Sequence, residues 1–154
     1  MQGNEALIKA LNSILADEFA AIHQYGAHLA MVGNWQYTRL AAYIAEHLED
    51  ERKHAAALMD RIAFLGGVID APALGRVVVG ADVPAQLAAD GGGELRAIQS
   101  YERAIVLAVQ VGDNKTRDLL AANLADENDH LQDVEARQRQ AAAMTLANFL
   151  SAQI

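Results

Sequence analysis

Apolar residues recur at three- and four-residue steps along four long stretches of the chain, the spacing that places them on one face of an α-helix. The first stretch runs from Leu7 to Leu29. The second runs from Leu40 to Leu65, where a pair of glycines marks its end. Each stretch is therefore predicted to be an amphipathic helix with one buried face.

Residues that favour helix starts introduce the third and fourth stretches. Asp82 with Pro84 precedes the third, and Asp113 is a good N-cap for the fourth. A short fifth helix is predicted near residues 142–153. Three consecutive glycines, 91–93, fall within the third stretch and cost roughly 2–3 kcal/mol relative to alanine in a helix. Either they form a loop and helix three begins after them, or packing overrides the propensity.

The lengths of the connections predict how the helices are arranged. Glycine-containing pairs at 33–34 and 112–113 mark tight turns, which join neighbouring helices into antiparallel pairs. Residues 66–82 form a longer connection that would cross the bundle, so that helix three runs parallel to helix two. Three valines at 77–79 indicate an extended piece that could pair with a neighbouring subunit. The prediction is an all-α, ferritin-like four-helix bundle in one domain over residues 1–154, with a long crossover between helices two and three and a short fifth C-terminal helix.

Composition removes several classes of function. With no cysteine among 154 residues, the chain cannot form disulfides, thiolate metal sites or iron–sulfur clusters, which fits a reducing cytoplasm. No apolar run approaches the length of a membrane helix, and no secretory signal is visible at the N-terminus. The net charge of −8 argues against a nucleic-acid partner and is compatible with cation handling. We therefore expect a cytoplasmic protein that binds neither nucleic acid nor membrane.

Six polar residues interrupt the apolar stripes in two trios with the same spacing. The trios are Glu18, Glu51 and His54, and Glu94, Glu127 and His130. One constant shift relates them, from 18 to 94, from 51 to 127 and from 54 to 130. Each glutamate stands where a core residue belongs, and each histidine lies three positions after a glutamate, on the same helix face. The two halves of the chain would therefore place the trios about a pseudo-twofold axis.

Four buried carboxylates need compensating charge, because an isolated buried charge costs many kcal/mol or takes up a proton. None of the twelve lysines and arginines falls on these inward stripes. Two divalent ions would balance the four negative charges, and oxygen-rich sites with some imidazole suit iron or manganese. The simpler alternative to a metal centre is that these acids lie on solvated helix faces and that their spacing is accidental. Paired glutamates with two Glu-x-x-His motifs are the known signature of dinuclear carboxylate bundles.

Several segments match one family in place. They are the Met1-Gln2-Gly3 start, Ala21 to Tyr25 with His28, Trp35, Glu51 to Ala55, and the ending Asn148 to Ile154. Over nearly its whole length the chain resembles the bacterioferritins. The resemblance implies a hollow shell of twenty-four subunits, with the fifth helix at the fourfold axes, that oxidises Fe(II) and stores ferric mineral. It also implies two iron ions per subunit.

By the same resemblance, the six polar residues divide into three pairs of ligands. Glu18 and Glu94 are terminal ligands, Glu51 and Glu127 bridge the two ions, and His54 and His130 cap them. Tyr25, two turns after Glu18, is either a core tyrosine with a hydrogen-bonded hydroxyl or a residue that passes an electron. Glu46 and Asp50 face away from the bundle core, as a solvated acidic face or as an inner-surface iron site.

The haem position is the main departure from the family. Haem-binding members carry a methionine where this chain has Arg52. Arginine cannot ligate iron as a thioether does, so no haem is expected in a shell made of this chain alone. A mixed shell with a second, haem-binding subunit stays open. The solitary histidines His23, His28 and His47 are assigned to surface or packing positions. Glu49 and Asp126 are assigned to solvated faces.

Three functions are compatible with these observations. The favoured one is a ferroxidase and iron-storage subunit that uses O2 or peroxide and relies on an electron-donor protein for iron release. The second keeps the metal centre in a di-metal oxidase or peroxide-scavenging enzyme, although such oxidases tend to be longer. The third is a non-catalytic structural subunit of a mixed shell, which would show no fast Fe(II) oxidation.

Overall fold

The computed structural model describes residues 3–154 and consists of helices, with no strand among the described residues. The helices are α1 (Glu5–Asn34), α2 (Thr38–Phe64), α3 (Val83–Gln110), α4 (Asn114–Met144) and α5 (Leu146–Ser151). The predicted ferritin-like four-helix bundle with a short C-terminal helix is confirmed. The first two residues of the N-terminal resemblance lie outside the described part of the chain.

The predicted helix starts are confirmed by the caps that the structure shows. The Asp82 carboxylate accepts a hydrogen bond from the backbone N–H of Ala85 at 2.9 Å, and Asp113 caps α4 through the N–H of Thr116 at 3.0 Å. Glycine ends two helices: Gly66 has φ +75° and Gly112 has φ +74°, a left-handed conformation that costs other residues steric strain.

Two boundaries differ from the sequence prediction. The first tight turn lies at residues 35–37, with Gln36 at φ +64°, because α1 continues through Gly33 and Asn34. The fifth helix begins at Leu146, since residues 142–144 still belong to α4 and Thr145, at φ +67°, breaks the helix there. The alanines that close α4 are strong helix formers, which explains why it runs on.

Helix α3 runs without interruption through the three glycines, so the loop alternative at 91–93 is wrong. Gly91 is buried against α4, and a Cβ atom at this position would lie 3.3 Å from Val134 Cγ1, closer than most real contacts. The lost helix propensity is therefore offset by close packing of two helices.

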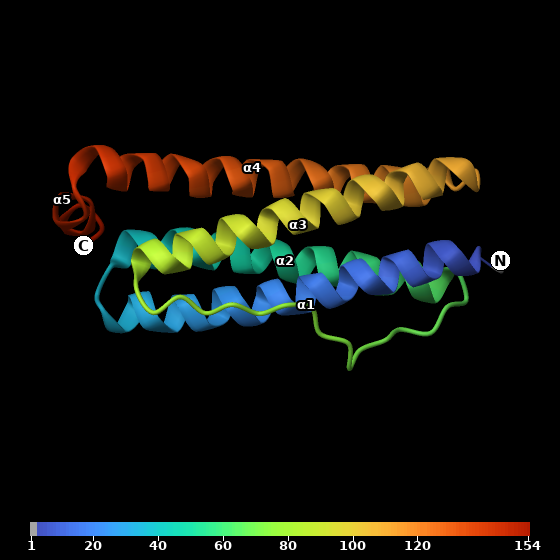
Figure 1. Cartoon of the computed structure of the whole chain (residues 1–154). Helices are drawn as coiled ribbons and strands as arrows, with labels where there is room; N and C mark the ends of the chain where they lie inside the picture. Colours follow the sequence, from blue (N-terminus) through green and yellow to red (C-terminus); the bar gives the residue numbers. More distant parts are fainter. Residues whose placement is uncertain (1–2) are drawn as a thin grey trace.

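The helices form two antiparallel pairs, α1 with α2 and α3 with α4, and α3 runs parallel to α2 (Figure 1). The crossover at residues 65–82 lies along α1 on its way to α3 (Figure 1). Backbone N–H groups of Gly75, Val78 and Gly80 bond to α1, at distances of 2.8, 2.9 and 3.0 Å. The extended piece at 77–79 is thus held within the subunit, and its pairing with a neighbour stays a prediction. No described helix is long and apolar enough to cross a membrane.

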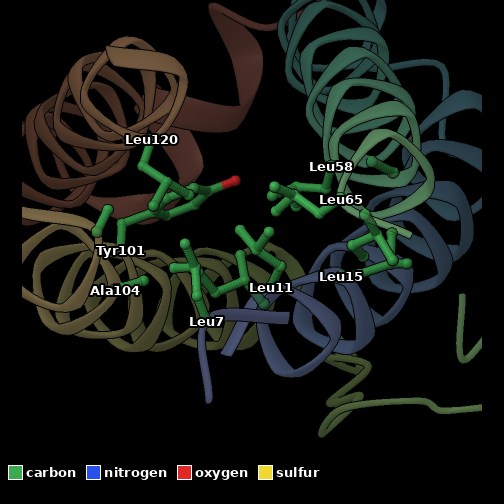
Figure 2. Packing of buried hydrophobic residues seen from close by; sticks show 12 residues of the cluster. Leu7, Leu11, Leu15, Leu58, Leu65, Tyr101, Ala104 and Leu120 are labelled. Carbon is green, nitrogen blue, oxygen red and sulfur yellow. The ribbon is translucent and has the colours of Figure 1, made fainter. Parts of the chain in front are cut away.

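Two apolar clusters fill the bundle, one towards each end. The first is built around Leu7, Leu11, Leu58, Tyr101 and Leu120, and Figure 2 shows these side chains converging between the four helices. The second contains Tyr25, Val32, Leu48, Leu87 and Val134. On every long helix the residues that interrupt the stripe fall between the two clusters. The apolar core therefore encloses a polar layer at mid-bundle.

Candidate metal centre

The polar layer contains all six residues of the two predicted trios. Each is only 1–5% exposed, and all four long helices contribute: Glu18, Glu51, His54, Glu94, Glu127 and His130. Charged groups are almost never buried this deeply without a partner. The inward direction predicted from the stripes is confirmed.

The six side chains form two groups that share two members. In the first group, ligand atoms of Glu18, Glu51, His54 and Glu127 lie within 4.8 Å of one another. In the second, ligand atoms of Glu51, Glu94, Glu127 and His130 do the same. Each group could hold one ion. Because Glu51 and Glu127 belong to both, two adjacent ions would be bridged by these carboxylates.

Several ligand atoms at the centre lack a hydrogen-bond partner. They are both carboxylate oxygens of Glu51, Oε1 of Glu127, and the Nδ1 atoms of His54 and His130. They are close to one another: His54 Nδ1 lies 3.0 Å from Glu127 Oε1, and His130 Nδ1 lies 3.2 Å from Glu51 Oε1. Buried polar atoms are rarely left unpaired. Their convergence on a common space fits two cations.

The carboxyl groups differ in how readily they ionise when no ion is bound. Burial raises the pKa of Glu18 and of Glu94 well above the ordinary value, and repulsion from Glu51 and Glu127 adds to the effect. Burial also acts to raise the pKa of Glu51, but contacts with His130 and His54 outweigh it and lower the pKa. Glu51 is therefore the ionised partner of the two imidazoles.

Both histidines at the centre favour the protonated form without metal. Burial alone would lower the pKa of His54, but contacts with Glu127 and Glu51 raise it to about 10. The pKa of His130 is raised in the same way, against its burial, chiefly by Glu51. When no metal is bound, protons on both imidazoles and on Glu18 and Glu94 thus provide the positive charge that metal ions would provide. Metal binding must displace them.

Two tyrosines hold the carboxyl groups of Glu18 and Glu94, one tyrosine on each. The Tyr25 hydroxyl donates to Glu94 Oε1, and the Tyr101 hydroxyl donates to Glu18 Oε1. Burial and the nearby carboxylates raise the pKa of both hydroxyls, so both keep their protons. Tyr101 was not among the predicted site residues. Its signal was available, because the shift that relates the two trios also relates positions 25 and 101.

Two acidic residues lie behind the histidines on the α2–α4 side. His54 Nε2 lies 3.1 Å from Asp126 Oδ2, and His130 Nε2 lies 3.5 Å from Asp50 Oδ2. A proton shared with these carboxylates at Nε2 leaves Nδ1 directed at the centre, the usual arrangement of metal-binding histidines. Asp126 is 56% exposed, as the solvated-face prediction requires, but it also orients His54. Positions 50 and 126 obey the same shift as the trios.

Comparison with known proteins decides the family. The family model described as a ferritin-like domain matches residues 8–144. The chain is 36% identical to a bacterial ferritin of Pseudomonas aeruginosa and 33% identical to one of Neisseria meningitidis serogroup B, in both cases over 100% of each chain. It is also 33% identical to a bacterioferritin of Mycolicibacterium paratuberculosis, over 89% of this chain and 86% of that one. The chain belongs to the bacterioferritin family.

The chain has an exposed arginine, Arg52, at the position where the resemblance places the haem ligand of haem-binding members. Arg52 is 57% exposed and lies 3.5 Å from Glu49, one turn earlier on α2. Glu46 is also exposed. Asp50 does not simply face away from the bundle, since it contacts both His130 and Lys53, whose Nζ lies 2.7 Å away.

Two of the three histidines regarded as solitary have partners that the sequence did not reveal. His28 is fully buried: its Nδ1 lies 3.2 Å from Asp90 Oδ2, and its Nε2 accepts the N–H of Gly80 at 3.0 Å. The His47 ring stacks on His130 with ring centres 4.1 Å apart, and burial together with His130 lowers the pKa of His47 to about 4. His23 is exposed, as predicted. These pairs join residues far apart in sequence, so local spacing could not identify them.

Proposed function

We propose that this chain is an iron-storage and detoxification subunit that oxidises Fe(II) to Fe(III) at a di-iron centre within each subunit. One observation carries the proposal: two groups of four ligands share Glu51 and Glu127. The relatives named bacterial ferritin and bacterioferritin support iron as the metal. Glu18 and Glu94 would be terminal ligands, and His54 and His130 would cap the ions.

The residues around the centre have different roles in the proposed reaction. The shared carboxylates hold two Fe(II) ions next to each other, so that an oxidant can take one electron from each. Two electrons and two protons convert O2 to hydrogen peroxide, or peroxide to water. Asp50 and Asp126 keep the histidines oriented, while Tyr25 and Tyr101 hold the terminal carboxylates. Tyr25, which donates a hydrogen bond to Glu94, would be the residue that passes an electron to or from the centre.

Membership of the family supports an oligomeric shell. We propose a cytoplasmic shell, twenty-four subunits in the homomeric form, that receives ferric product as mineral. Glu46 and Asp50 on the α2–α4 side would offer carboxylates to iron that leaves the centre. Haem would require a second, methionine-bearing subunit, since Arg52 offers no ligand. An electron-donor protein would be needed to release stored iron.

The test is rapid mixing of metal-free protein with Fe(II) in air. The proposal predicts a fast phase that consumes about two Fe(II) per subunit and is lost in Glu127→Gln, which keeps the shape but removes a shared charge. Asp118→Asn, an exposed acid on the same helix, is the matched control and should behave as wild type. Oxidation no faster than in buffer, in all three proteins, would contradict the ferroxidase and leave a structural subunit.

A further inference from the structure

A small cavity leads from the α1–α3 side of the bundle to the metal centre. Its inner end is lined by carboxylates of the centre, including Glu18 and Glu94, and its outer end by Asp17, Arg76 and Arg96. We refer to it as the α1–α3 opening. It lies on the opposite side of the bundle from Asp50 and Asp126, which belong to α2 and α4. The two sides of the centre therefore differ in chemistry.

The size of the α1–α3 opening limits what can pass. Its free volume is about 30 Å³, enough for about two water molecules. A divalent ion travels with several tightly held waters, so it would have to lose them before reaching the carboxylates. Dioxygen and hydrogen peroxide are small, uncharged and free of such a shell. Size alone thus favours the oxidant over the metal ion.

The charges at the outer end of the α1–α3 opening also favour an uncharged oxidant over a metal ion. Two exposed guanidinium groups, Arg76 and Arg96, line it together with one half-buried carboxylate, Asp17, which Arg96 partly neutralises. The other carboxylate of the wall, Asp90, is already bound by Gln24 at 2.8 Å and by His28. Two arginines therefore stand against one carboxylate, so the outer end carries net positive charge. On the α2–α4 side, exposed Asp126 adds negative charge instead.

The wall of the α1–α3 opening is fixed in place. Hydrogen bonds from Gly75 and Val78 to α1 hold the crossover on either side of Arg76. On α3 the wall includes Gly93, where a Cβ atom would meet only Gln24 Nε2 at 3.8 Å and Arg96 at 4.0 Å. The missing side chain of Gly93 leaves space beside the centre. A larger residue would fill it.

We propose that the α1–α3 opening is the route by which the uncharged oxidant, O2 or peroxide, reaches the centre, and that metal ions load from elsewhere. The proposal rests on the ferroxidase function proposed above. It assigns Gly93 the role of keeping the route open. It assigns Arg76 and Arg96 the role of discouraging cations at the outer end.

Plugging the α1–α3 opening separates metal loading from oxidation. In Gly93→Leu, Co²⁺ should load at the wild-type rate and stoichiometry, read from its visible spectrum. When protein loaded with Fe(II) without air is mixed with limiting O2, oxidation should be at least about tenfold slower than wild type. Gly26→Leu, at a helical glycine with nothing within 4 Å of its Cβ position, controls for glycine replacement and should match wild type in both measurements.

Two results would overturn the proposal. If Co²⁺ loading slows by the same factor as oxidation, the metal uses this route. If neither the Co²⁺ loading rate nor the oxidation rate changes, neither the metal nor the oxidant passes through the opening. Ala97→Leu, which fills the same wall one turn later on α3, provides the test if Gly93→Leu does not fold. Wild-type protein that binds Co²⁺ but never oxidises Fe(II) would instead contradict the proposed ferroxidase.

Discussion

The two halves of the metal centre carry the same ligands but different surroundings. On one side, Tyr101 donates to Glu18 and accepts a hydrogen bond from Asn123 at 3.0 Å. On the other, Tyr25 donates to Glu94, and the residue equivalent to Asn123 is His47, 3.4 Å from the hydroxyl. The ligands are constrained because their charges must balance those of the ions. The residues that contact the tyrosines, Asn123 and His47, only have to form hydrogen bonds. The two candidate ion positions are therefore related but not equivalent.

The difference extends further on the Tyr25 side. Asp90 is buried there with His28, although the equivalent position in the first half of the chain is the core residue Ile14. That network anchors the crossover, which exists only on this side of the bundle. The asymmetry thus follows from the topology of the chain, and the following variants test how far it affects metal binding.

The largest effect is expected from removing a shared ligand rather than a terminal one. Glu51→Ala deletes a group common to both ion positions and should abolish tight Co²⁺ binding, whereas Glu18→Ala should retain about one ion per subunit. Titration of metal-free protein with Co²⁺ measures the stoichiometry. Glu135→Ala, an exposed acid on α4, is the control. Two ions bound by both ligand variants would show that the carboxylates are not shared.

The protons held by the empty centre predict a steep pH dependence. Each ion should displace about two protons, so its apparent affinity should rise by about 100-fold per pH unit below neutrality and flatten towards the raised pKa of His54, about 10. Titrations in buffers of different ionisation enthalpy measure the protons released. An affinity independent of pH would contradict the protonated state of the empty centre.

The same raised pKa affects the stability of the metal-free protein. A group whose pKa is higher in the folded than in the unfolded state stabilises the folded protein. The contribution is complete at a pH below the unfolded-state pKa, and it is lost as the pH rises through the folded-state pKa. For His54 the window runs from about 6.5 to about 10. The melting temperature of metal-free protein should fall across it, while bound Co²⁺ should remove that fall. Equal pH profiles with and without Co²⁺ would argue against this assignment.

Removing Asp126 and removing Asp50, the two acids that contact the histidines, should reduce the affinity for Co²⁺ by unequal amounts. Asp126→Ala should weaken one ion by about 10- to 100-fold, since loss of such partners frees the imidazole. Asp50→Ala should weaken the other less, because its distance to His130 is longer and Lys53 already binds it. Co²⁺ affinities of both variants, with Asp118→Ala as the control, measure the difference. A larger loss in Asp50→Ala would reverse the order that the distances predict.

The smallest effects are expected at the tyrosines. Tyr101→Phe leaves Glu18 and Asn123 without a partner and should lower the free energy of unfolding by about 1–3 kcal/mol. Tyr25→Phe should cost less, about 1 kcal/mol, because His47 is only loosely bonded. Denaturant unfolding of metal-free protein at fixed subunit concentration provides the comparison, with Tyr37→Phe as the control. Equal losses would mean that the two surroundings are energetically alike.

Much of this molecule could be predicted from its sequence because two strong signals agree. Helical periodicity and the caps at Asp82 and Asp113 define the long helices, and the shifted trios place six polar residues inside them. The same shift could have identified Tyr101 and Asp126. Taken alone, neither residue indicates a site, because an exposed acid on a helix is ordinarily solvated and a tyrosine on an apolar stripe is ordinarily part of the core.

Other features depend on contacts that local sequence does not encode. Helix three passes through Gly91 because α4 packs closely against it, and no propensity scale includes that partner. The pairing of His28 with Asp90 joins residues on different helices, so each looks isolated along the chain. The turn at Gln36 shows a third limit, since nearby Gly33 offered the more obvious break.

The most direct test of the central claim is to locate the ions. Crystals soaked with Fe(II) without air should show two anomalous peaks at the iron absorption edge, both within bonding distance of Glu51 and Glu127, one capped by His54 and the other by His130. A single peak, or iron bound only to acids on the surface of the bundle, would contradict a dinuclear centre in this chain.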